Sequence, residues 1–298
     1  MSTATIRHND LPLAAAVRQV LGLFKLRIGV GIALTALAGL AVSPGAALPA
    51  WKIALLGIAV LLSSASAGAF NQYVESDIDR RMKRTRKRAF VTGALPRTTG
   101  WLWVILALVA GSVAAAWWAL NPWAALYTFL GAFVYAVVYT VWLKRRTWLN
   151  IVVGGLAGSF AVLAGAAAVD PRIGAVPMVL AVVLFLWTPP HFWSLAIAYR
   201  KDYEEAGVPM LPVVVGDARA AKVILLHTAL LVAVSLAPVF LGLGRVYLCG
   251  AVAGGAWFLT TSWRLVRQPG PKTAMVNFHA SLAQLMLLLS AAILDAAL

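Results

Sequence analysis

Cysteine is nearly absent from this 298-residue chain, in which Cys249 stands alone. A single cysteine excludes an internal disulfide framework and a CxxC metal site, and it disfavours cysteine-based redox chemistry. Acidic residues are also scarce, with 10 Asp and Glu against 25 Lys and Arg. Most of them fall in two groups, one at Glu75, Asp77 and Asp79 and the other at Asp202, Glu204, Glu205 and Asp217. We therefore expect function to reside in these two segments.

Charge of either sign is rare, because only 12% of residues are charged while 62% are hydrophobic and the mean hydropathy is +0.86. An ordinary globular domain is about half apolar. A helix of about 20 apolar residues crosses a bilayer, and nine windows of this chain satisfy that length. The sequence predicts an all-α integral membrane protein with about nine transmembrane helices, near residues 28–47, 51–70, 101–120, 123–143, 149–169, 174–196, 223–243, 246–263 and 276–297.

The net charge of +15 has an explanation other than nucleic acid, because membrane proteins concentrate Lys and Arg in cytoplasmic loops. If the N-terminus is cytoplasmic, the inner segments hold 22 of the 25 basic residues, and only Lys52, Arg172 and Arg245 fall outside. We expect no nucleic-acid partner, a cytoplasmic N-terminus, an external C-terminus and residence in the bacterial inner membrane. Residues 1–27 are predicted to form a retained cytoplasmic leader, and residues 28–298 a single transmembrane domain.

This topology brings the two acidic groups to one face of the membrane. The second and sixth helices run in the same direction, so the segments that follow Phe70 and Tyr199 emerge together. The inner loops at 71–100 and 199–222 are therefore predicted to face each other.

Asn71, Glu75 and Asp79 recur at intervals of four residues, which places three oxygen groups on one stripe of a continuing helix. Carboxylates of this kind bind Mg²⁺ together with substrate phosphates. Asp77 falls on another face. The competing interpretation is a solvated loop whose acids neutralise the basic run that follows.

That basic run extends from Arg80 to Arg88. Arginine pairs bidentately with phosphate oxygens, so acids and arginines side by side predict a diphosphate site. A topological role, or contact with anionic membrane lipid, explains some of the same charges equally well.

The sixth helix carries a second stripe, in which His191, Tyr199 and Asp202 share one face if the helix continues. Pro189 and Pro190 are expected to break or kink it. His191 is predicted either to line a cavity or to pack between helices with a hydrogen-bonded neighbour, and the sequence favours neither.

Several of these segments resemble the motifs of a known family. The run from Asn71 to Arg80, followed by Arg84 and Arg88, resembles the first aspartate-rich motif of the intramembrane aromatic prenyltransferase superfamily. The later segments resemble the branch of that superfamily that farnesylates protohaem IX, namely Tyr139-Thr140 with Lys144-Arg145, Asn150 to Gly155, Pro190-His191-Phe192 and the run from Tyr199 to Pro212.

The resemblance implies helices around a central cavity, with transfer of the farnesyl group of farnesyl diphosphate to a vinyl group of haem B, giving haem O. It implies Mg²⁺ as cofactor. The residues that would hold this ion, and that would also be the catalytic residues, are Asn71, Glu75, Asp79 and Asp202. Substrate contacts would come from Arg84, Arg88, Lys144, Arg145, His191 and two tyrosines, Tyr139 and Tyr199, that stabilise a carbocation.

Two other functions remain open. The same diphosphate site would serve prenylation of an aromatic acid or quinone precursor. An ion-coupled transporter is disfavoured, because the acids lie at helix ends rather than near the membrane centre. A haem-handling or oxidase-assembly protein is a further candidate partner.

Overall fold

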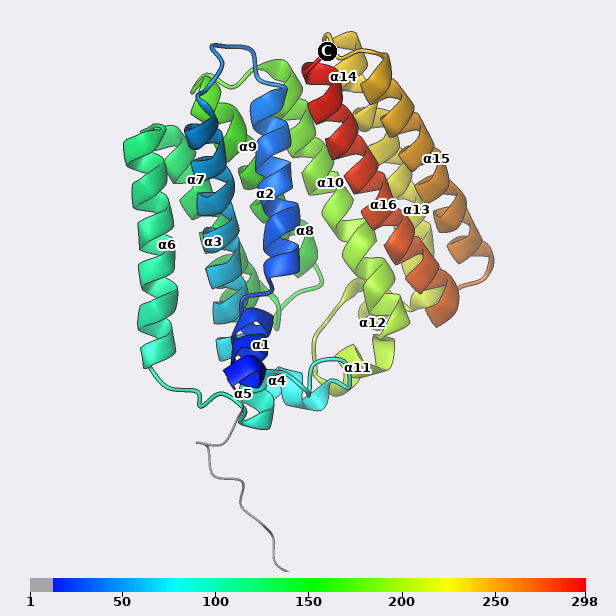
Figure 1. Ribbon diagram of the computed structural model, residues 1–298. Helices are drawn as coiled ribbons and strands as arrows, with labels where there is room; N and C mark the ends of the chain where they lie inside the picture. Colours follow the sequence, from blue (N-terminus) through cyan, green and yellow to red (C-terminus); the bar gives the residue numbers. More distant parts are fainter. Residues whose placement is uncertain (1–12) are drawn as a thin grey trace, which may run out of the picture.

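The computed structural model describes residues 13–298, and this part of the chain is helical throughout, without strands (Figure 1). Most of the predicted leader can be followed from α1 (Leu13–Leu23) onward, whereas its charged residues Arg7 and Asp10 lie outside the described residues. Leu23 packs with Ala69, Phe90 and Ile105, so the described end of the leader is part of the folded bundle.

A helix occupies each of the nine predicted windows. The long elements are α2 (Leu26–Ala41), α3 (Ala50–Val74), α6 (Gly100–Ala119), α7 (Pro122–Phe133) with η1 (Val134–Leu143), α8 (Asn150–Gly154) with α9 (Leu156–Val169), α10 (Ala175–Ala198), α13 (Asp217–Ser235) with α14 (Ala237–Phe240), α15 (Arg245–Arg267) and α16 (Pro271–Ala296).

By length and composition, seven helical stretches in the described part of the chain are able to cross a membrane, and the bent pair α1–α2 makes up to eight. Helix α15 is long enough but is not among them, since basic residues bound it at both ends and polar residues such as Thr261 and Ser262 lie within its uncharged stretch. The structure therefore has a helix at each of the nine predicted spans. That α15 crosses the membrane as a ninth span stays a prediction.

The bundle has two halves joined by central helices. Helices α2, α3, α6, α7 and α9 pack on one side, and α10, α13, α15 and α16 pack on the other. Contacts of α10 with α9, and of α16 with α2, join the halves.

The short helices α4 (Ser76–Arg81), α5 (Ala89–Thr92), α11 (Arg200–Glu205) and α12 (Leu211–Val215) gather at one end of the bundle with α1, opposite α14 and the C-terminus (Figure 1). The two acidic segments thus emerge at the same end, as predicted.

Two glycines allow α2 and α9 to cross at close range. A Cβ on Gly39 would lie 2.2 Å from the carbonyl oxygen of Val162, and one on Gly165 would lie 1.8 Å from that of Ala36. Only hydrogen fits at these two positions, and small residues are the usual way in which membrane helices approach closely.

Of the break or kink predicted at Pro189 and Pro190, the break is absent, because α10 continues through both residues. Proline inside a membrane helix is tolerated when neighbouring groups satisfy the freed carbonyls. The carbonyls freed here are those of Phe185 and Leu186, four residues before the two prolines.

Candidate active site

The first acidic group lies where α3 passes into α4. The helix does not continue unbroken as the spacing predicted, because Glu75 ends α3 and precedes α4 with φ −92° and ψ 13°. Hydrogen bonds between residues four apart nevertheless continue from Glu75 N to Asn71 O and from Asp79 N to Glu75 O. Asn71, Glu75 and Asp79 are consequently buried together, while the Asp77 side chain is 54% exposed.

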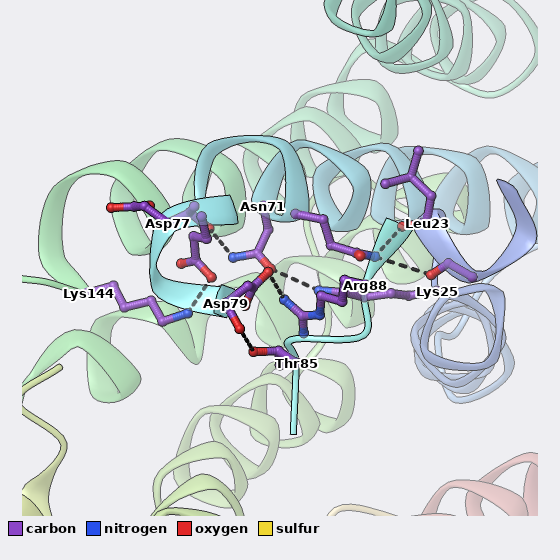
Figure 2. A network of polar contacts seen from close by, with 12 residues as sticks. Leu23, Lys25, Asn71, Asp77, Asp79, Thr85, Arg88 and Lys144 are labelled. Carbon is purple, nitrogen blue, oxygen red and sulfur yellow. Dashed lines mark hydrogen bonds and ion pairs between the residues drawn. The ribbon is translucent and has the colours of Figure 1, made fainter. Parts of the chain in front are cut away.

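A basic side chain contacts each of these three buried groups (Figure 2). The Lys25 ammonium donates to Asn71 Oδ1 at 2.9 Å, Lys144 pairs with Glu75 Oε2, and Arg88 pairs with Asp79 Oδ2 at 2.6 Å. Figure 2 shows Lys144 approaching from one side of Asn71 and Asp79, and Lys25 and Arg88 from the other. Within one buried cluster, each side-chain oxygen group therefore has a basic side chain beside it. Such a cluster is suited to a ligand that carries both a metal and phosphates.

The donors of this cluster fit a magnesium ion that shares its coordination with a substrate. Glu75 Oε1 is buried and has no hydrogen-bond partner among the described residues, which leaves a carboxylate oxygen available as a ligand. No three His, Cys, Asp or Glu side chains of residues 13–298 lie close enough to hold a metal by themselves. Mg²⁺ is usually bound by one or two carboxylates with phosphate oxygens and water, so a pair of acids is sufficient.

The second acidic segment closes on the first. Asp202 is buried and accepts a hydrogen bond from the backbone N–H of Arg84 at 3.2 Å, and the Arg84 guanidinium lies 5.7 Å from the centre of the Tyr199 ring. The predicted stripe along one helix is wrong, since α10 ends at Ala198 and Asp202 belongs to the separate α11. Asp202 thus reaches the first loop through a turn at Tyr199.

A π-helix positions the tyrosines of the site. In η1 the Lys144 backbone N–H bonds to the Tyr139 carbonyl five residues earlier, a wide turn that is frequent at functional sites. Tyr135 and Tyr139 stack at 5.6 Å, Lys25 lies 5.9 Å from the Tyr135 ring, and Lys144 lies 5.6 Å from the Tyr139 ring. The same turn directs Thr140 to accept from Asn71 Nδ2 at 3.2 Å.

Arg145 is not part of this cluster. Its guanidinium pairs with both oxygens of Asp77 at 2.8 and 2.9 Å on the exposed side of α4. Partial burial opposes ionisation of Asp77, but the hydrogen bonds from Arg145 prevail and hold the pKa of this carboxyl below its usual value. The structure thus separates Arg145 from Lys144, although the two are adjacent in sequence.

His191 lies apart from the carboxylates, in a buried contact between α10 and α16. Its ring stacks on Trp187 at 4.2 Å and on Phe278 at 4.4 Å, and Nδ1 is 2.7 Å from the Ser281 hydroxyl oxygen. At its two faces and at Nδ1 the ring is the packed histidine with a hydrogen-bonded neighbour, one of the two alternatives left open by the sequence.

Sequence reasoning missed Lys25 and Tyr135. Lys25 is the last lysine before the first apolar run and was counted among the topological charges, although its ammonium contacts Asn71 and the Tyr135 hydroxyl. One signal was available in the sequence. Lys25 lies at the start of the first span, on the same side of the membrane as the two predicted acidic loops.

Comparison with known proteins agrees with this fold. Residues 32–289 match the family model described as the UbiA prenyltransferase family. The chain belongs to the UbiA prenyltransferase family, and with its long apolar helices it is an integral membrane protein.

Among curated relatives, the chain is similar to protoheme IX farnesyltransferase 2 of Paramagnetospirillum magneticum, with 54% identity over 95% of this chain and 98% of the relative. It is 40% identical to protoheme IX farnesyltransferase 1 of Cenarchaeum symbiosum over 94% of this chain and 96% of the relative. The particular enzymes that it resembles are therefore named protoheme IX farnesyltransferases, in two different organisms.

Solved structures share the fold. A UbiA homologue from Aeropyrum pernix superposes with a TM-score of 0.73 at 22% identity, covering 91% of this chain and 98% of that one. A UbiA homologue from Archaeoglobus fulgidus bound to GPP and Mg²⁺ gives 0.70 at 18% identity, covering 94% of this chain and all of the other.

Proposed function

We propose that this protein transfers the farnesyl group of farnesyl diphosphate to a vinyl group of haem B, giving haem O and diphosphate. The observation that carries the proposal is the buried cluster in which Lys144, Arg88 and Lys25 contact Glu75, Asp79 and Asn71. The acceptor is supported by the names of the relatives, which cover nearly the whole chain at up to 54% identity.

The cluster would bind the diphosphate through both kinds of group. Glu75 and Asp79, with Asn71 beside them, would hold Mg²⁺, and Asp202 would complete the site from the second loop. Arg84, Arg88, Lys144 and the newly found Lys25 are the cations for the phosphate oxygens. Arg145 would act at the rim, where it already holds Asp77.

The chemistry follows from these charges. Bound Mg²⁺ supplies positive charge to the departing diphosphate. The basic side chains stabilise the same charge in a buried site, which makes ionisation of the allylic C–O bond accessible. Tyr135 and Tyr139 offer stacked ring faces beside Lys25 and Lys144, and with Tyr199 they would stabilise the farnesyl cation by about 0.5–2 kcal/mol each.

The acceptor completes the balance of the reaction. The electron pair of the vinyl group forms the new C–C bond to the farnesyl carbon, which leaves a cation on the porphyrin side chain. Water adds to this cation and loses a proton, so the products are haem O, diphosphate and a proton.

The same proposal includes the setting of the enzyme. The end that carries α4, α5 and α11 would face the cytoplasm, since it holds most of the basic residues, whereas Arg172 and Arg245 lie in or beside connections at the other end. The membrane would be the bacterial inner membrane, with the C-terminus outside.

The experiment is a product analysis on purified protein in lipid. Farnesyl diphosphate, Mg²⁺ and haem B should yield haem O by mass spectrometry, while omission of any one of them should yield none. Parallel reactions replace haem B with an aromatic acid. Farnesylation of the aromatic acid without any conversion of haem B would replace the haem assignment with the aromatic-acid alternative.

A further inference from the structure

The contact between α10 and α16 holds a histidine that the carboxylate cluster does not use. The His191 ring lies between Trp187 and Phe278, nearly parallel to both, with interplanar angles of 19° and 25°. Because both faces of the imidazole are covered, only its edge remains for polar contacts.

A hydrogen-bond chain on that edge favours one nitrogen as the carrier of the proton. The Ser281 hydroxyl donates to the Phe278 carbonyl oxygen at 2.7 Å, and the same hydroxyl oxygen is 2.7 Å from His191 Nδ1. With its single hydrogen on the Phe278 carbonyl oxygen, the Ser281 hydroxyl offers only its lone pairs to His191, so in this arrangement Nδ1–H donates to Ser281. A neutral imidazole has a single N–H, and Nε2 is therefore left with its lone pair.

That lone pair has no hydrogen-bond donor among the described residues. Some other nitrogens of the described residues, such as Trp193 Nε1 and His227 Nδ1, have no partner and are also sealed from solvent. His191 Nε2 is not one of these sealed atoms, so it keeps some accessible surface. His191 as a whole keeps 6% of its surface accessible. A clamped acceptor nitrogen that is neither paired nor sealed is open to a ligand.

A second hydrogen bond joins the main chain of Ser281 to α10, and it does not involve the hydroxyl. Trp187 Nε1 donates to the Ser281 backbone carbonyl oxygen at 2.9 Å. Ser281 of α16 therefore contacts two side chains of α10, Trp187 through its main chain and His191 through its hydroxyl. The hydroxyl can thus be removed while the other link between the helices stays.

We infer that Ser281 is a positioning residue, which holds His191 as its Nδ1–H tautomer and so presents Nε2 as a ligand for the iron of an iron porphyrin. Histidines that bind metals regularly donate their other N–H to a neighbour that orients the ring. The inference rests on the proposed function, in which haem B is the acceptor.

The test titrates haem B into the purified full-length chain and follows the Soret band. The wild type should bind with a Soret shift, and Ser281→Ala should bind about 10-fold to 100-fold more weakly. Ser281→Thr keeps the hydroxyl and should restore binding. Trp187→Phe removes the other link and keeps an aromatic ring on His191, so it should bind haem nearly as the wild type does. Farnesyl diphosphate binding should be unchanged in all three variants.

Nitrogen NMR of histidine-labelled protein tests the tautomer without haem, with His191→Asn for assignment. Nε2 should be unprotonated in the wild type, and a protonated Nε2 would overturn the inference. Haem binding by Ser281→Ala at wild-type strength would overturn the inference about Ser281 and leave the proposed function standing. Failure of the wild type to bind haem B, with the expected tautomer, would overturn the iron-ligand role together with the proposed acceptor.

Discussion

The backbone N–H of Arg84 donates to the carboxylate of Asp202 over 3.2 Å, although the two residues are 118 positions apart. This bond joins the loop after α3 to the loop after α10. Because it uses the main chain of Arg84, it leaves the guanidinium free to lie against Tyr199. The two loops therefore form one site at one end of the bundle.

Loss of the buried oxygens should abolish metal-dependent turnover. Asn71→Ala, Glu75→Ala, Asp79→Ala and Asp202→Ala are each expected to lower the Mg²⁺-dependent rate at least about 100-fold, the scale of a lost electrostatic contact. Asp77→Ala is the matched control, because that carboxylate is exposed and pairs with Arg145. Near-normal rates in folded Glu75 and Asp79 variants would contradict the proposed metal site.

The contribution of the Asp77–Arg145 pair should depend on pH in a defined direction. The folded pKa of Asp77 is lowered, so the pair is fully formed above the usual carboxyl pKa and is lost as the pH falls through the lower folded value. The difference in thermal stability between wild type and Asp77→Asn should therefore shrink in acid. The exposure of both side chains keeps the effect small, and a difference that grows in acid would refute this account.

Lys25 should matter more than any exposed lysine of the same end. Lys25→Met removes the donor that holds Asn71 and is expected to lower turnover about 10-fold to 100-fold, the range found when a group that orients a metal ligand is lost. Lys83→Met serves as the control, since Lys83 is exposed and belongs to the basic run. Equal rates in the two variants would show that Lys25 acts only as a topological charge.

The crossing of α2 and α9 should not accept a side chain. Gly165→Val is expected to destabilise the protein by about 1–3 kcal/mol or more, because its Cβ would overlap the Ala36 carbonyl. Gly111→Ala in α6 is the control, as nothing lies within 4 Å of a Cβ there. Thermal unfolding in detergent should separate the two, and a stable Gly165→Val protein would mean that the helices are more widely spaced.

The orientation can be tested with single cysteines in a Cys249→Ala background. Ala46→Cys and Lys87→Cys are exposed positions at opposite ends of the bundle. A membrane-impermeant thiol reagent should label Ala46→Cys from outside intact cells and Lys87→Cys only after lysis. Labelling of both from the same side would invalidate the orientation.

The sequence predicted what apolar run length and residue spacing determine. Each apolar window became a helix, and the interval of four residues placed Asn71, Glu75 and Asp79 together with Asp77 turned away. These properties are local, since they depend on the period of one helix. Their roles in catalysis remain predictions.

The missed features depend on contacts between distant segments. Lys25 and Tyr135 meet across 110 positions, and nothing in the composition of either segment indicates the other. The stack around His191 requires knowing that Phe278 of α16 lies against α10. The continuation of α10 through two prolines depends on the surroundings of the helix, which helical periodicity alone does not reveal.

The π-helix at Val134–Leu143 makes this site sensitive to chain length rather than only to residue identity. Removing a single residue from η1 would let ordinary α-helical pairing resume. Because each residue turns an α-helix by about 100°, such a deletion would rotate one flank of η1 relative to the other. Tyr135 and Lys144 would then no longer face the same cluster, although every side chain of the site would still be encoded. Deletion of Val137 should thus inactivate the enzyme more thoroughly than most substitutions at that position.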